Sequence, residues 1–478
     1  MSKFKETLKN PSKFRLSYLI VLFFCNVAFV QIPAYVCLVF LFIWGVYLVF
    51  RKIFKDNCFD RLRFGLWIVL FLGVNLLTML INITSSFLSF GYNVVMLLHI
   101  SICFFIFYGI HTEKGFNPRA ELYKVCKFVI YATSILGSIG FALMMMGVRF
   151  EWMWIKFIIF ENRYTGVYIN PNILGFISVI SIVCCHLVMK PDFLIKAKRT
   201  RVSRIWIAIC LSVDLFSLIL CDSNASFTLF VCYVIFTLVF IYFSSSARMK
   251  KRQFFIKTVA VLIAAVYVVF AAFMVRSVCQ RGFSQLVKSS KVDKKVVVAI
   301  NEKTNEEAIT FTHENKNIDS GRLKLIRESF ELFKISPVFG ISNGNIIEYS
   351  QKYLNGTLDL SYHNSDIHNG YLTTLVSTGI VGFLIFALWG LKFGKHIVVN
   401  LFKRQNAGSQ DILPCLFAFC CGYLVYSLFE KALLYDISFM VMWFWYMLGM
   451  TSIYLNKYEP LMGEHYMLRK HRIPRHLI

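Results

Sequence analysis

Acidic residues are scarce in this chain of 478 amino acids, and charged residues of either sign make up only 16% of it. Asp and Glu together number 26, against 51 Lys and Arg, so the formal net charge is +25. Hydrophobic residues supply 57% of the chain and aromatic residues 17%. A water-soluble protein of this length could not hide so much apolar surface, whereas a lipid bilayer can. The composition therefore predicts a membrane protein.

A net charge of +25 would suit a nucleic-acid-binding protein, but the distribution of the basic residues does not indicate a binding groove. The basic residues sit in short clusters between apolar runs, which is typical of membrane topology. The 14 cysteines lie almost all inside apolar runs, with only Cys279 in a polar segment, so neither a disulfide framework nor zinc-ligand spacing is present. We interpret them as small hydrophobic residues. We expect no cleavable signal peptide, because the first apolar run continues far beyond signal length.

Long apolar runs fill most of the chain, and a helix that crosses a bilayer needs about 20 residues. The uncharged stretch from Leu16 to Phe50 is too long for one crossing and is expected to break at Gln31-Ile32-Pro33. The stretch from Phe64 to Ile110 divides likewise around Asn82 to Asn93. The sequence thus predicts an all-α polytopic membrane protein with about 12 transmembrane helices. The further spans are expected near 128–148, 172–189, 205–221, 225–243, 256–275, 369–391, 412–429 and 433–455.

Positive charges set the orientation of such a bundle, because they gather in cytoplasmic loops. With the N-terminus inside, the seven cytoplasmic segments hold 34 of the 51 Lys and Arg. Four more lie in the short outer loops. The other 13 lie in one long outer loop at 276–368, and the charge rule does not apply to long loops. Both termini are therefore predicted to be cytoplasmic. The short outer loops hold only Arg149, Lys156, Arg163 and Lys431.

This topology divides the chain into three parts. Residues 1–275 form a bundle of nine spans, 276–368 the large extracytoplasmic loop, and 369–478 three spans with a basic cytoplasmic tail. Inside the loop, two β-prone runs around a polar connector predict a hairpin at 295–312. An amphipathic helix is expected from the cap Asp319-Ser320 to Pro337. Its apolar residues at helical spacing are Leu323, Ile326, Phe330 and Phe333.

Four polar segments on the predicted outer face are candidates for chemistry, and the first precedes the sixth span. Asn170 suits a helix cap, and Pro171 suits the first helical position before Asn172. A helix start does not explain Arg163 or Gly166 just upstream. A functional role for Arg163 therefore stays open beside the structural one.

The second segment is the tight turn from Asp222 to Ser226, which contains Asn224. Small polar residues suit any turn, so this segment alone indicates little. Asp214 lies eight residues earlier, within the seventh span, where a carboxylate normally faces the bundle interior. It is either functional or a protonated structural residue.

The third segment, Ser320-Gly321-Arg322, leads into the helix of the long loop. An arginine at a helix N-terminus is unfavourably placed for the helix dipole, which suggests an anionic partner. The guanidinium offers a fork of donors that matches phosphate oxygens. The alternative is a surface arginine that touches lipid headgroups.

The fourth segment runs from His363 through Asp366, His368 and Asn369 into the tenth span. The spacing of its two histidines and Asp366 is not that of a standard helical metal site, so we predict no metal. His368 at the membrane surface could act as a base near neutral pH. The alternative is a histidine that only packs or hydrogen-bonds at a helix start.

Taken in order, these segments resemble the O-antigen ligase and polymerase superfamily. Its members are bacterial membrane glycosyltransferases that use polyprenyl-diphosphate-linked glycans. The resemblance runs from about residue 160 to residue 435, and it rests on the order, spacing and shared face of the pieces. The matching pieces are Arg163-x-x-Gly166, Asn170-Pro171-Asn172, Ser320-Gly321-Arg322, Pro337-x-x-Gly340, His368-Asn369-x-x-Leu372, Gly379-Ile380-x-Gly382 and Phe429-Glu430.

One turn departs from the family pattern. The outer turn after the seventh span often reads Ser-Arg in this family, whereas here it is Ser223-Asn224. An arginine expected to help hold the diphosphate is therefore missing. Arg163 or Lys431 could replace it.

The resemblance implies a GT-C-like bundle in the bacterial cytoplasmic (inner) membrane. It implies transfer of a glycan from an undecaprenyl (polyprenyl) diphosphate donor to a glycan acceptor, with inversion and without a metal or other cofactor. His368 would accept the acceptor's proton, and Arg322 would stabilise the leaving diphosphate. Roles in binding the diphosphate or the glycan are implied for Arg163, Asn172, Asn224, Asn369 and Lys431. Trp152, Trp154, Tyr164 and Tyr168 are placed to line an outer glycan cavity.

We favour a polymerase of a surface polysaccharide, of O-antigen, capsule or exopolysaccharide type. Ligation to lipid A-core is the alternative; it needs a Gram-negative cell, which nothing in the sequence indicates. A transporter or flippase predicts two similar six-span halves, and no internal repeat is visible. The bilayer and the two glycan substrates are the expected partners, with chain-length regulator and flippase proteins as further candidates.

The orientation can be tested by cysteine labelling from outside the cell. We expect an engineered cysteine near Thr304 to react and one near Lys198 to stay unlabelled until the membrane is permeabilised. The opposite labelling pattern would place every candidate residue on the cytoplasmic side.

Overall fold

Helices dominate the computed structural model, which confirms an all-α polytopic membrane protein as the coarse fold class. Seven helices within the described residues are long and apolar enough to cross a membrane. They are Ala28–Phe54, Phe87–Thr112, Pro118–Met145, Pro171–Val188, Asn224–Tyr242, Phe255–Gln285 and Gly370–Leu401. The structure describes residues 6–83, 85–113, 115–146, 150–152, 155–160, 162–190, 202–245, 251–289, 322–354, 367–403 and 412–456.

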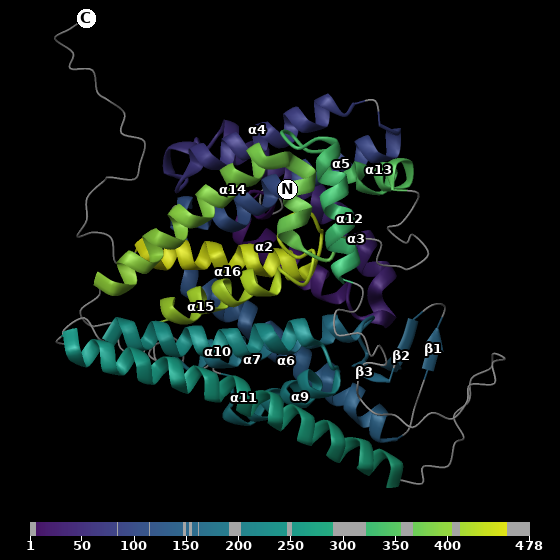
Figure 1. The fold of residues 1–478 in the computed structure, drawn as a ribbon, viewed down its shortest axis with the longest axis vertical. Coiled ribbons are helices and arrows are strands. Elements are labelled where there is room, and N and C mark those ends of the chain that lie inside the picture. Colours follow the sequence, from purple (N-terminus) through teal and green to yellow (C-terminus); the bar gives the residue numbers. More distant parts are fainter. Residues whose placement is uncertain are drawn as a thin grey trace, which may run out of the picture.

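A helix occupies each of the twelve predicted spans (Figure 1). Five of these helices, α2, α4, α9, α15 and α16, are not among the seven, so twelve crossings remain a prediction. The twelve helices are α2 (Pro11–Phe24), α3 (Gln31–Phe54), α4 (Gly65–Ile81), α5 (Phe87–Ile102), α6 (Pro118–Met145), α7 (Pro171–Val188), α9 (Arg204–Leu220), α10 (Asn224–Ser245), α11 (Lys251–Ser289), α14 (Gly370–Lys403), α15 (Leu413–Tyr426) and α16 (Phe439–Asn456). Short helical turns are η1 (Ala28–Val30), η2 (Cys58–Arg61), the π-helix η3 (Cys103–Phe107), η4 (Tyr108–Thr112) and η5 (Asn343–Asn345).

Three helices begin in the same way, with an asparagine followed by a proline. The side chains of Asn10, Asn117 and Asn170 accept hydrogen bonds from backbone N–H groups in the first turns of α2, α6 and α7. The proline that follows each cap lacks the N–H that would otherwise be unsatisfied at the first helical position. The predicted start of the sixth span at Asn170-Pro171 is therefore confirmed.

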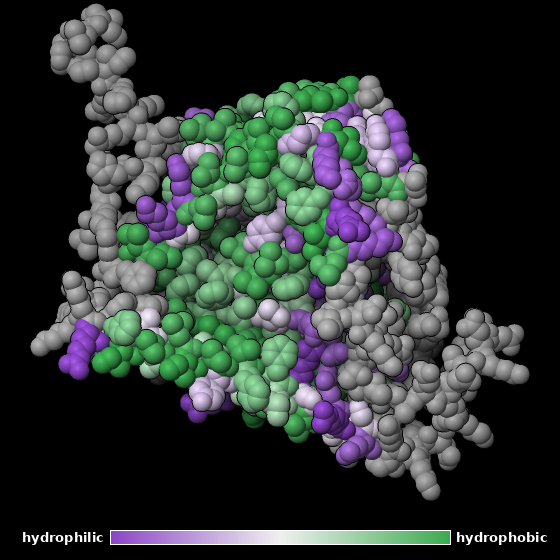
Figure 2. Space-filling model, in the orientation of Figure 1, coloured by the Kyte–Doolittle hydropathy of each residue, from purple (hydrophilic) through white to green (hydrophobic). Residues whose placement is uncertain are grey.

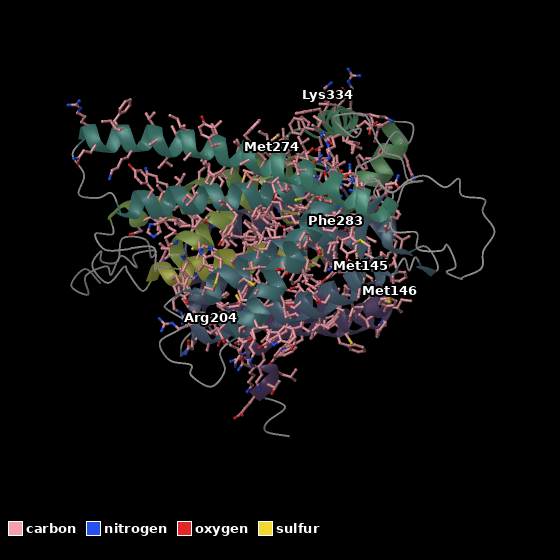
Figure 3. All side chains as sticks on the ribbon, turned by 90° about the horizontal axis from the view of Figure 1, so that it is seen from below. Met145, Met146, Arg204, Met274, Phe283 and Lys334 are labelled. Atoms are coloured by element: carbon pink, nitrogen blue, oxygen red, sulfur yellow. The ribbon has the colours of Figure 1, made fainter. Side chains whose placement is uncertain are left out.

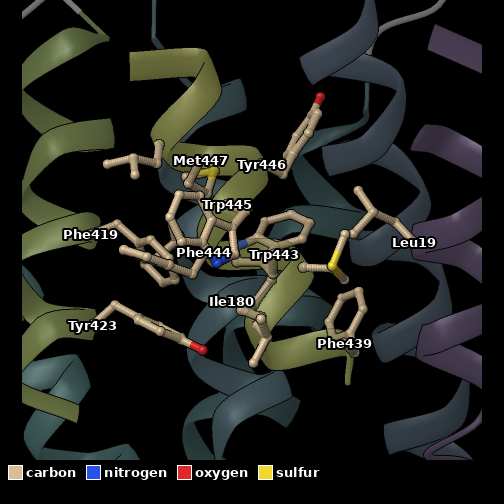
Figure 4. Close-up of a cluster of buried hydrophobic side chains, with 14 of the residues drawn as sticks. Leu19, Ile180, Phe419, Tyr423, Phe439, Trp443, Phe444, Trp445, Tyr446 and Met447 are labelled. Carbon is tan, nitrogen blue, oxygen red and sulfur yellow. The ribbon is translucent and has the colours of Figure 1, made fainter. Parts of the chain in front are cut away.

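The C-terminal helix α16 lies at the centre of the apolar core, although it is the last to be synthesised. Figure 4 shows its aromatic residues among side chains from α2, α7 and α15. The ring of Phe444 stacks on Tyr423 with centroids 4.5 Å apart, and Trp445 lies 5.6 Å from Trp389 of α14. α16 therefore joins the N-terminal and C-terminal helices into one bundle.

A buried group of four charges ties the N-terminal helices together. Arg15 of α2 is fully buried and donates to Glu113 at 2.6 Å and to Glu121 of α6 at 2.8 Å. Lys52 of α3 donates to the same Glu113 oxygen at 2.8 Å. Two cations and two carboxylates neutralise one another, as buried charges in a membrane protein must. We call this the neutral cluster.

Figure 2 shows a broad hydrophobic band on one face of the bundle, with hydrophilic residues toward the start of α11 on the left and toward α12 on the right. Seen from below in Figure 3, Arg204 at the start of α9 lies toward the left. Met145 at the end of α6 and Lys334 of α12 lie toward the right. The described part of the long loop is therefore at the end where α6 finishes, which the charge pattern predicts to be outside.

A three-stranded antiparallel sheet was not expected from the sequence. Strands β1 (Phe150–Trp152), β2 (Ile155–Phe160) and β3 (Arg163–Gly166) follow one another in order β1-β2-β3. A register shift lies between Ile158 and Ile159, where Ile158 adopts a positive φ of 70°. This short segment between two spans contains a β-bulge, so its alternation pattern is interrupted and gives no clear strand signal. Arg163 is the first residue of β3, so the sheet holds its backbone in place.

Helix α14 is broken at Gly379, whose φ of 63° and ψ of −171° are not helical. The break leaves backbone groups without helical partners, and the loop after Pro337 supplies new ones. Ile341 N–H donates to the carbonyl of Val376 at 3.0 Å, and Ile380 N–H donates to the carbonyl of Pro337 at 2.8 Å. A break in a membrane helix is tolerated where such partners lie within the protein.

Two glycines make this contact possible. A Cβ atom on Gly340 would lie 2.5 Å from the backbone nitrogen of Gly379, and one on Gly379 would overlap the carbonyl of Val338. Both glycines have positive φ, a conformation that is easy for glycine and strained for other residues. The Pro337-x-x-Gly340 and Gly379 pieces of the family resemblance therefore serve the fold.

The predicted amphipathic helix is present as α12 (Arg322–Ile335), followed by α13 (Ile346–Tyr353). Two residues of the predicted apolar stripe, Leu323 and Phe330, are exposed, so whether this stripe lies on the membrane stays a prediction. The buried face carries Glu328, Ser329 and Leu332 instead. α12 packs against α14.

Other predictions for the long loop have mixed outcomes. The helix that contains the ninth predicted span, α11, continues beyond residue 275 to Ser289 and includes Cys279. The hairpin predicted at 295–312 and the cap Asp319-Ser320 lie outside the described residues. The division into 1–275, 276–368 and 369–478 stays a prediction.

The glycine contact predicts that Gly379→Ala destabilises the protein. A positive φ combined with a ψ near 180° is adopted almost only by glycine and costs another residue roughly 1–3 kcal/mol, and the overlap with Val338 adds to this cost. Thermal unfolding of the detergent-purified protein should show a clear drop. Gly390→Ala on the same helix is the control, because a Cβ there meets nothing within 4 Å. Equal unfolding temperatures for the two variants would contradict this account.

Candidate functional site

The described part of the long loop brings Arg322, His368 and Glu430 together from three segments. Arg322 Nη2 lies 3.5 Å from Glu430 Oε1, and His368 Nδ1 lies 3.5 Å from Glu430 Oε2. The Arg322 guanidinium also lies over the ring of Phe429, 5.7 Å from its centroid. We call these three residues the histidine cluster. Arg322 precedes Glu430 by 108 positions in the sequence and His368 precedes it by 62, so these residues are brought into contact by the fold.

Glu430 is the shared partner of this cluster. Its side chain is 14% exposed, against 32% for Arg322 and 28% for His368, so the cation and the imidazole remain open to a ligand. A carboxylate can only accept hydrogen bonds, so it favours the imidazole tautomer with the proton on Nδ1. The Nε2 atom of His368 then keeps its lone pair.

Asn369 positions His368 by capping α14. Its Oδ1 accepts from the N–H groups of Tyr371 at 3.0 Å and Leu372 at 2.9 Å. Its Nδ2 donates to the carbonyl of Leu428 at 3.0 Å, and Gly370 N–H donates to the carbonyl of Ser427 at 2.8 Å. The start of α14 is thus joined to the turn that carries Glu430. A substrate contact for Asn369 stays a prediction beside this cap.

A second group of polar residues gathers at the starts of α7 and α10. Arg163 of β3 is buried and donates from Nη1 to Asn172 Oδ1 at 3.2 Å. Ser226 of α10 donates to the carbonyl of Asn172 at 3.2 Å, which joins the two helix starts. Asp222 and Asn224 complete the turn that leads into α10.

Arg276 of α11 reaches this turn, and the sequence did not single it out. Its Nη1 donates to Asn224 Oδ1 at 2.9 Å, and its Nη2 pairs with Asp222. Its guanidinium lies over the ring of Phe227, 4.8 Å from the centroid. Gln280, one turn further along α11, donates to Asp222 at 2.8 Å. Arg163, Asn172, Asp222, Asn224 and Arg276 are called the arginine cluster below.

The two clusters lie at the same end of the bundle, joined by aromatic packing. Phe176 of α7 is one turn after Asn172, and its ring lies 5.1 Å from that of Tyr426. Tyr426 ends α15, one turn before Glu430. The helices α7, α10 and α14 all begin at this end, so their N-terminal positive dipoles are directed toward it.

Several predicted site residues have other surroundings. Tyr164 and Tyr168 are buried at 1% and 2% exposure, so they pack in the core instead of lining a cavity. Trp152 lies in β1, while Trp154 is outside the described residues. Lys431 follows Glu430 directly and is half-buried. His363 and Asp366 also lie outside the described residues.

Asp214 is buried in a group of hydroxyl and thiol side chains. Thr133 of α6 and Cys210 of α9 each donate to Asp214 Oδ2 at 3.2 Å, and Ser181 of α7 lies 2.6 Å from Thr133. These contacts join three helices. They favour the structural interpretation of Asp214.

Comparison with protein families matches residues 207–387 to the family described as O-antigen ligase. The matched segment, somewhat more than a third of the chain, contains Asn224, Arg276, Arg322 and His368. Arg163, Asn172, Glu430 and Lys431 lie outside it. No curated protein matches the chain.

The cap at Asn369 predicts that Asn369→Ala loses stability of about 1 kcal/mol, because an unfilled helix cap costs that much. Asn369→Asp keeps the acceptor and should lose less. Thermal unfolding of purified protein measures both. Asn400→Ala on the same helix is the control, since among the described residues its amide hydrogen-bonds to His396 of α14. If both Asn369 variants keep wild-type stability and lose only activity, the residue is a ligand contact.

Proposed function

We propose that the chain polymerises lipid-linked oligosaccharide repeat units into a surface polysaccharide, and the match of residues 207–387 to the O-antigen ligase family supports this proposal. The family makes it a membrane enzyme of glycosyltransferase type. The observation that carries the proposal is the convergence of a forked cation, an imidazole and a carboxylate in the histidine cluster. A cation can stabilise a leaving diphosphate, and an imidazole held by a carboxylate can accept the proton of a hydroxyl group.

Arg322 is the group proposed to stabilise the leaving diphosphate. As the sugar carbon separates from the phosphate oxygen, negative charge develops on that oxygen, and a placed cation lowers the barrier. A guanidinium offers two parallel donors that fit phosphate oxygens. Arg322 is about one-third exposed and makes a long contact of 3.5 Å with Glu430, so an incoming anion can compete for it. This fork supplies the charge without a metal ion.

His368 is the proposed general base. With Nδ1 directed at Glu430, its Nε2 can take the proton of the acceptor hydroxyl. Glu430 would stabilise the imidazolium that forms, as the carboxylate of a Ser-His-Asp triad does for its histidine. The present 3.5 Å separation is long for a hydrogen bond, and such contacts commonly shorten when substrate binds.

The proposed reaction is a single displacement. The acceptor oxygen bonds to the sugar carbon that carries the diphosphate, the carbon–oxygen bond to the phosphate breaks, and the polyprenyl diphosphate leaves with the bonding electrons. The hydroxyl proton moves to His368. Attack from the face opposite the leaving group inverts the sugar carbon.

A polymerase and a ligase share this chemistry and differ in the acceptor. The polymerase is preferred because nothing in the sequence calls for lipid A-core. The bilayer carries the donor, and the proposed place is the cytoplasmic membrane of a bacterium with both termini inside. Arg163, Asn172 and Lys431 are proposed to contact the diphosphate or the glycan.

A gene deletion separates the possible functions when the surface glycan is run on a gel. Single repeat units attached to the surface identify a polymerase. Loss of attachment of long chains identifies a ligase and would replace the proposed acceptor. Lipid-linked units trapped inside the cell identify a flippase and would overturn the enzyme assignment.

His368→Ala is expected to insert and accumulate normally while making no polymer. A positioned base contributes roughly 10²–10⁴-fold to such a step, so turnover of lipid-linked repeat units by the purified variant should fall by about that factor. The measurement is chain length on a gel together with protein level in the membrane.

His396→Ala is the matched control, because His396 lies near the other end of α14 and contacts Asn400 of its own helix. It should polymerise normally. Substantial turnover by His368→Ala would remove the residue from the mechanism.

A further inference from the structure

Glu430 lies between two partners and is in close contact with neither. Its Oε1 atom is 3.5 Å from Arg322 Nη2, and its Oε2 atom is 3.5 Å from His368 Nδ1. Hydrogen bonds from nitrogen to oxygen are usually about 2.7–3.2 Å long, so both contacts are stretched. Glu430 has no other ion pair or side-chain hydrogen bond with the residues that the structure describes. One carboxylate is therefore shared by a cation and an imidazole.

The backbones that carry these three side chains are held firmly. The start of α14 packs directly on the turn that contains Glu430, because a Cβ atom on Gly370 would lie only 2.7 Å from that of Leu433. Tyr371 of α14 donates from its hydroxyl to the carbonyl of Leu424 at 2.8 Å. The loop that follows α12 is bonded in turn to the broken segment of α14. Any adjustment among the three groups is therefore a movement of side chains.

The side chains of the histidine cluster have room for such a movement. Arg322 and His368 are both partly exposed, and within the described part of the chain Glu430 is the only side chain that either one contacts through a polar atom. The Arg322 guanidinium also lies over the ring of Phe429. This contact between a cation and an aromatic face remains favourable when the guanidinium separates from Glu430.

Electrostatics predict how the cluster responds to the donor. A diphosphate bound to Arg322 occupies the donors that face Glu430, and its negative charge repels the carboxylate. The imidazole of His368, which donates from Nδ1, is then the better partner for Glu430. A shorter contact there orients Nε2 toward the acceptor and stabilises the positive charge that the ring gains with the proton.

We propose that Glu430 is a switch that moves from Arg322 to His368 when the donor diphosphate binds. The base is then fully held only while the donor is in place, so the acceptor hydroxyl is activated after the donor has arrived. The proposal rests on the proposed function, since it describes the regulation of the same site. Glu430 is a positioning residue in this scheme, because it acts on the acceptor through His368.

A static role for Glu430 makes different predictions. If the carboxylate only braces Arg322, His368 has the same surroundings with and without the arginine, and donor binding leaves them unchanged. If Glu430 is a switch, removal of Arg322 frees the carboxylate for His368 in the same way as the diphosphate does. Ligand-free Arg322→Ala should then resemble diphosphate-bound wild type at the imidazole.

The test records nitrogen NMR signals of purified full-length protein that contains isotope-labelled histidine, at constant pH. The His368 signals are identified by their loss in His368→Gln. Sugar-free undecaprenyl diphosphate should shift the Nδ1 signal of His368 in the wild type, whereas uncharged undecaprenol should not. In Arg322→Ala the signal should be shifted already and should not respond to the diphosphate. In Glu430→Gln the response should be much smaller than in the wild type.

Binding and turnover distinguish positioning of the base from binding of the donor. Glu430→Gln should bind undecaprenyl diphosphate at least as tightly as wild type, because the group that competes for Arg322 has lost its charge. Its turnover of lipid-linked repeat units should fall by up to about 10⁴-fold, the loss expected when an amide replaces the carboxylate that orients a catalytic histidine. Glu331→Gln on α12 is the matched control, since Glu331 pairs with Lys334 of its own helix at 2.7 Å. It should keep both binding and turnover.

Three results would overturn the switch and leave the proposed cation and base in place. They are an unchanged His368 signal in wild type that has bound diphosphate, an equal shift with undecaprenol, and a ligand-free Arg322→Ala whose signal matches ligand-free wild type. Wild-type protein that binds no undecaprenyl diphosphate would instead overturn the proposed function itself. Thermal unfolding shows whether each variant is folded, and the wild-type titration decides the question without any variant.

Discussion

The structure depends on one requirement of the bilayer, which is that backbone groups freed by a broken helix must find partners inside the protein. α14 breaks at Gly379, and the loop that begins at Pro337 supplies the missing donors and acceptors. Because this loop directly follows α12, the contact that repairs α14 also fixes the helix that begins with Arg322. The same α14 begins beside His368. Backbone hydrogen bonds, more than side-chain contacts, thus set the distance between the proposed cation and the proposed base.

The sequence predicted the helices well, because long uncharged runs have few alternatives in a protein of this composition. It missed the sheet at β1–β3, whose short strands and bulge at Ile158 hide the alternation of side chains. It also did not show that the helix of the ninth span continues past residue 275, since Arg276 and Arg281 look like the edge of a membrane span. α11 continues because Arg276 and Gln280 find partners on a neighbouring turn, and such partners cannot be read from a local pattern.

The sequence singled out only some of the residues that the structure brings together at the candidate site, for a similar reason. Motif resemblance singled out Arg322 and His368, each from residues next to it in the sequence. Glu430 entered only as one piece of that resemblance, and its contact with Arg322 spans 108 positions. Arg276 carried no motif at all, and its contact with Asn224 spans 52 positions. Side chains that act through a distant partner are visible only when the fold brings that partner close.

The charges of the two ends of the bundle support the division between structure and function. The neutral cluster is complete by itself, because every cation in it touches a carboxylate and Arg15 is wholly enclosed. At the other end, Arg276 pairs with Asp222, and Arg322 lies 3.5 Å from Glu430 in a contact that leaves about a third of its side chain exposed. Arg15 is enclosed, so its contacts can serve only the fold, whereas Arg322 is open to an anion that would bind the proposed site. The start of α14 lies beside Arg322 and His368, and its dipole adds positive potential at the same place.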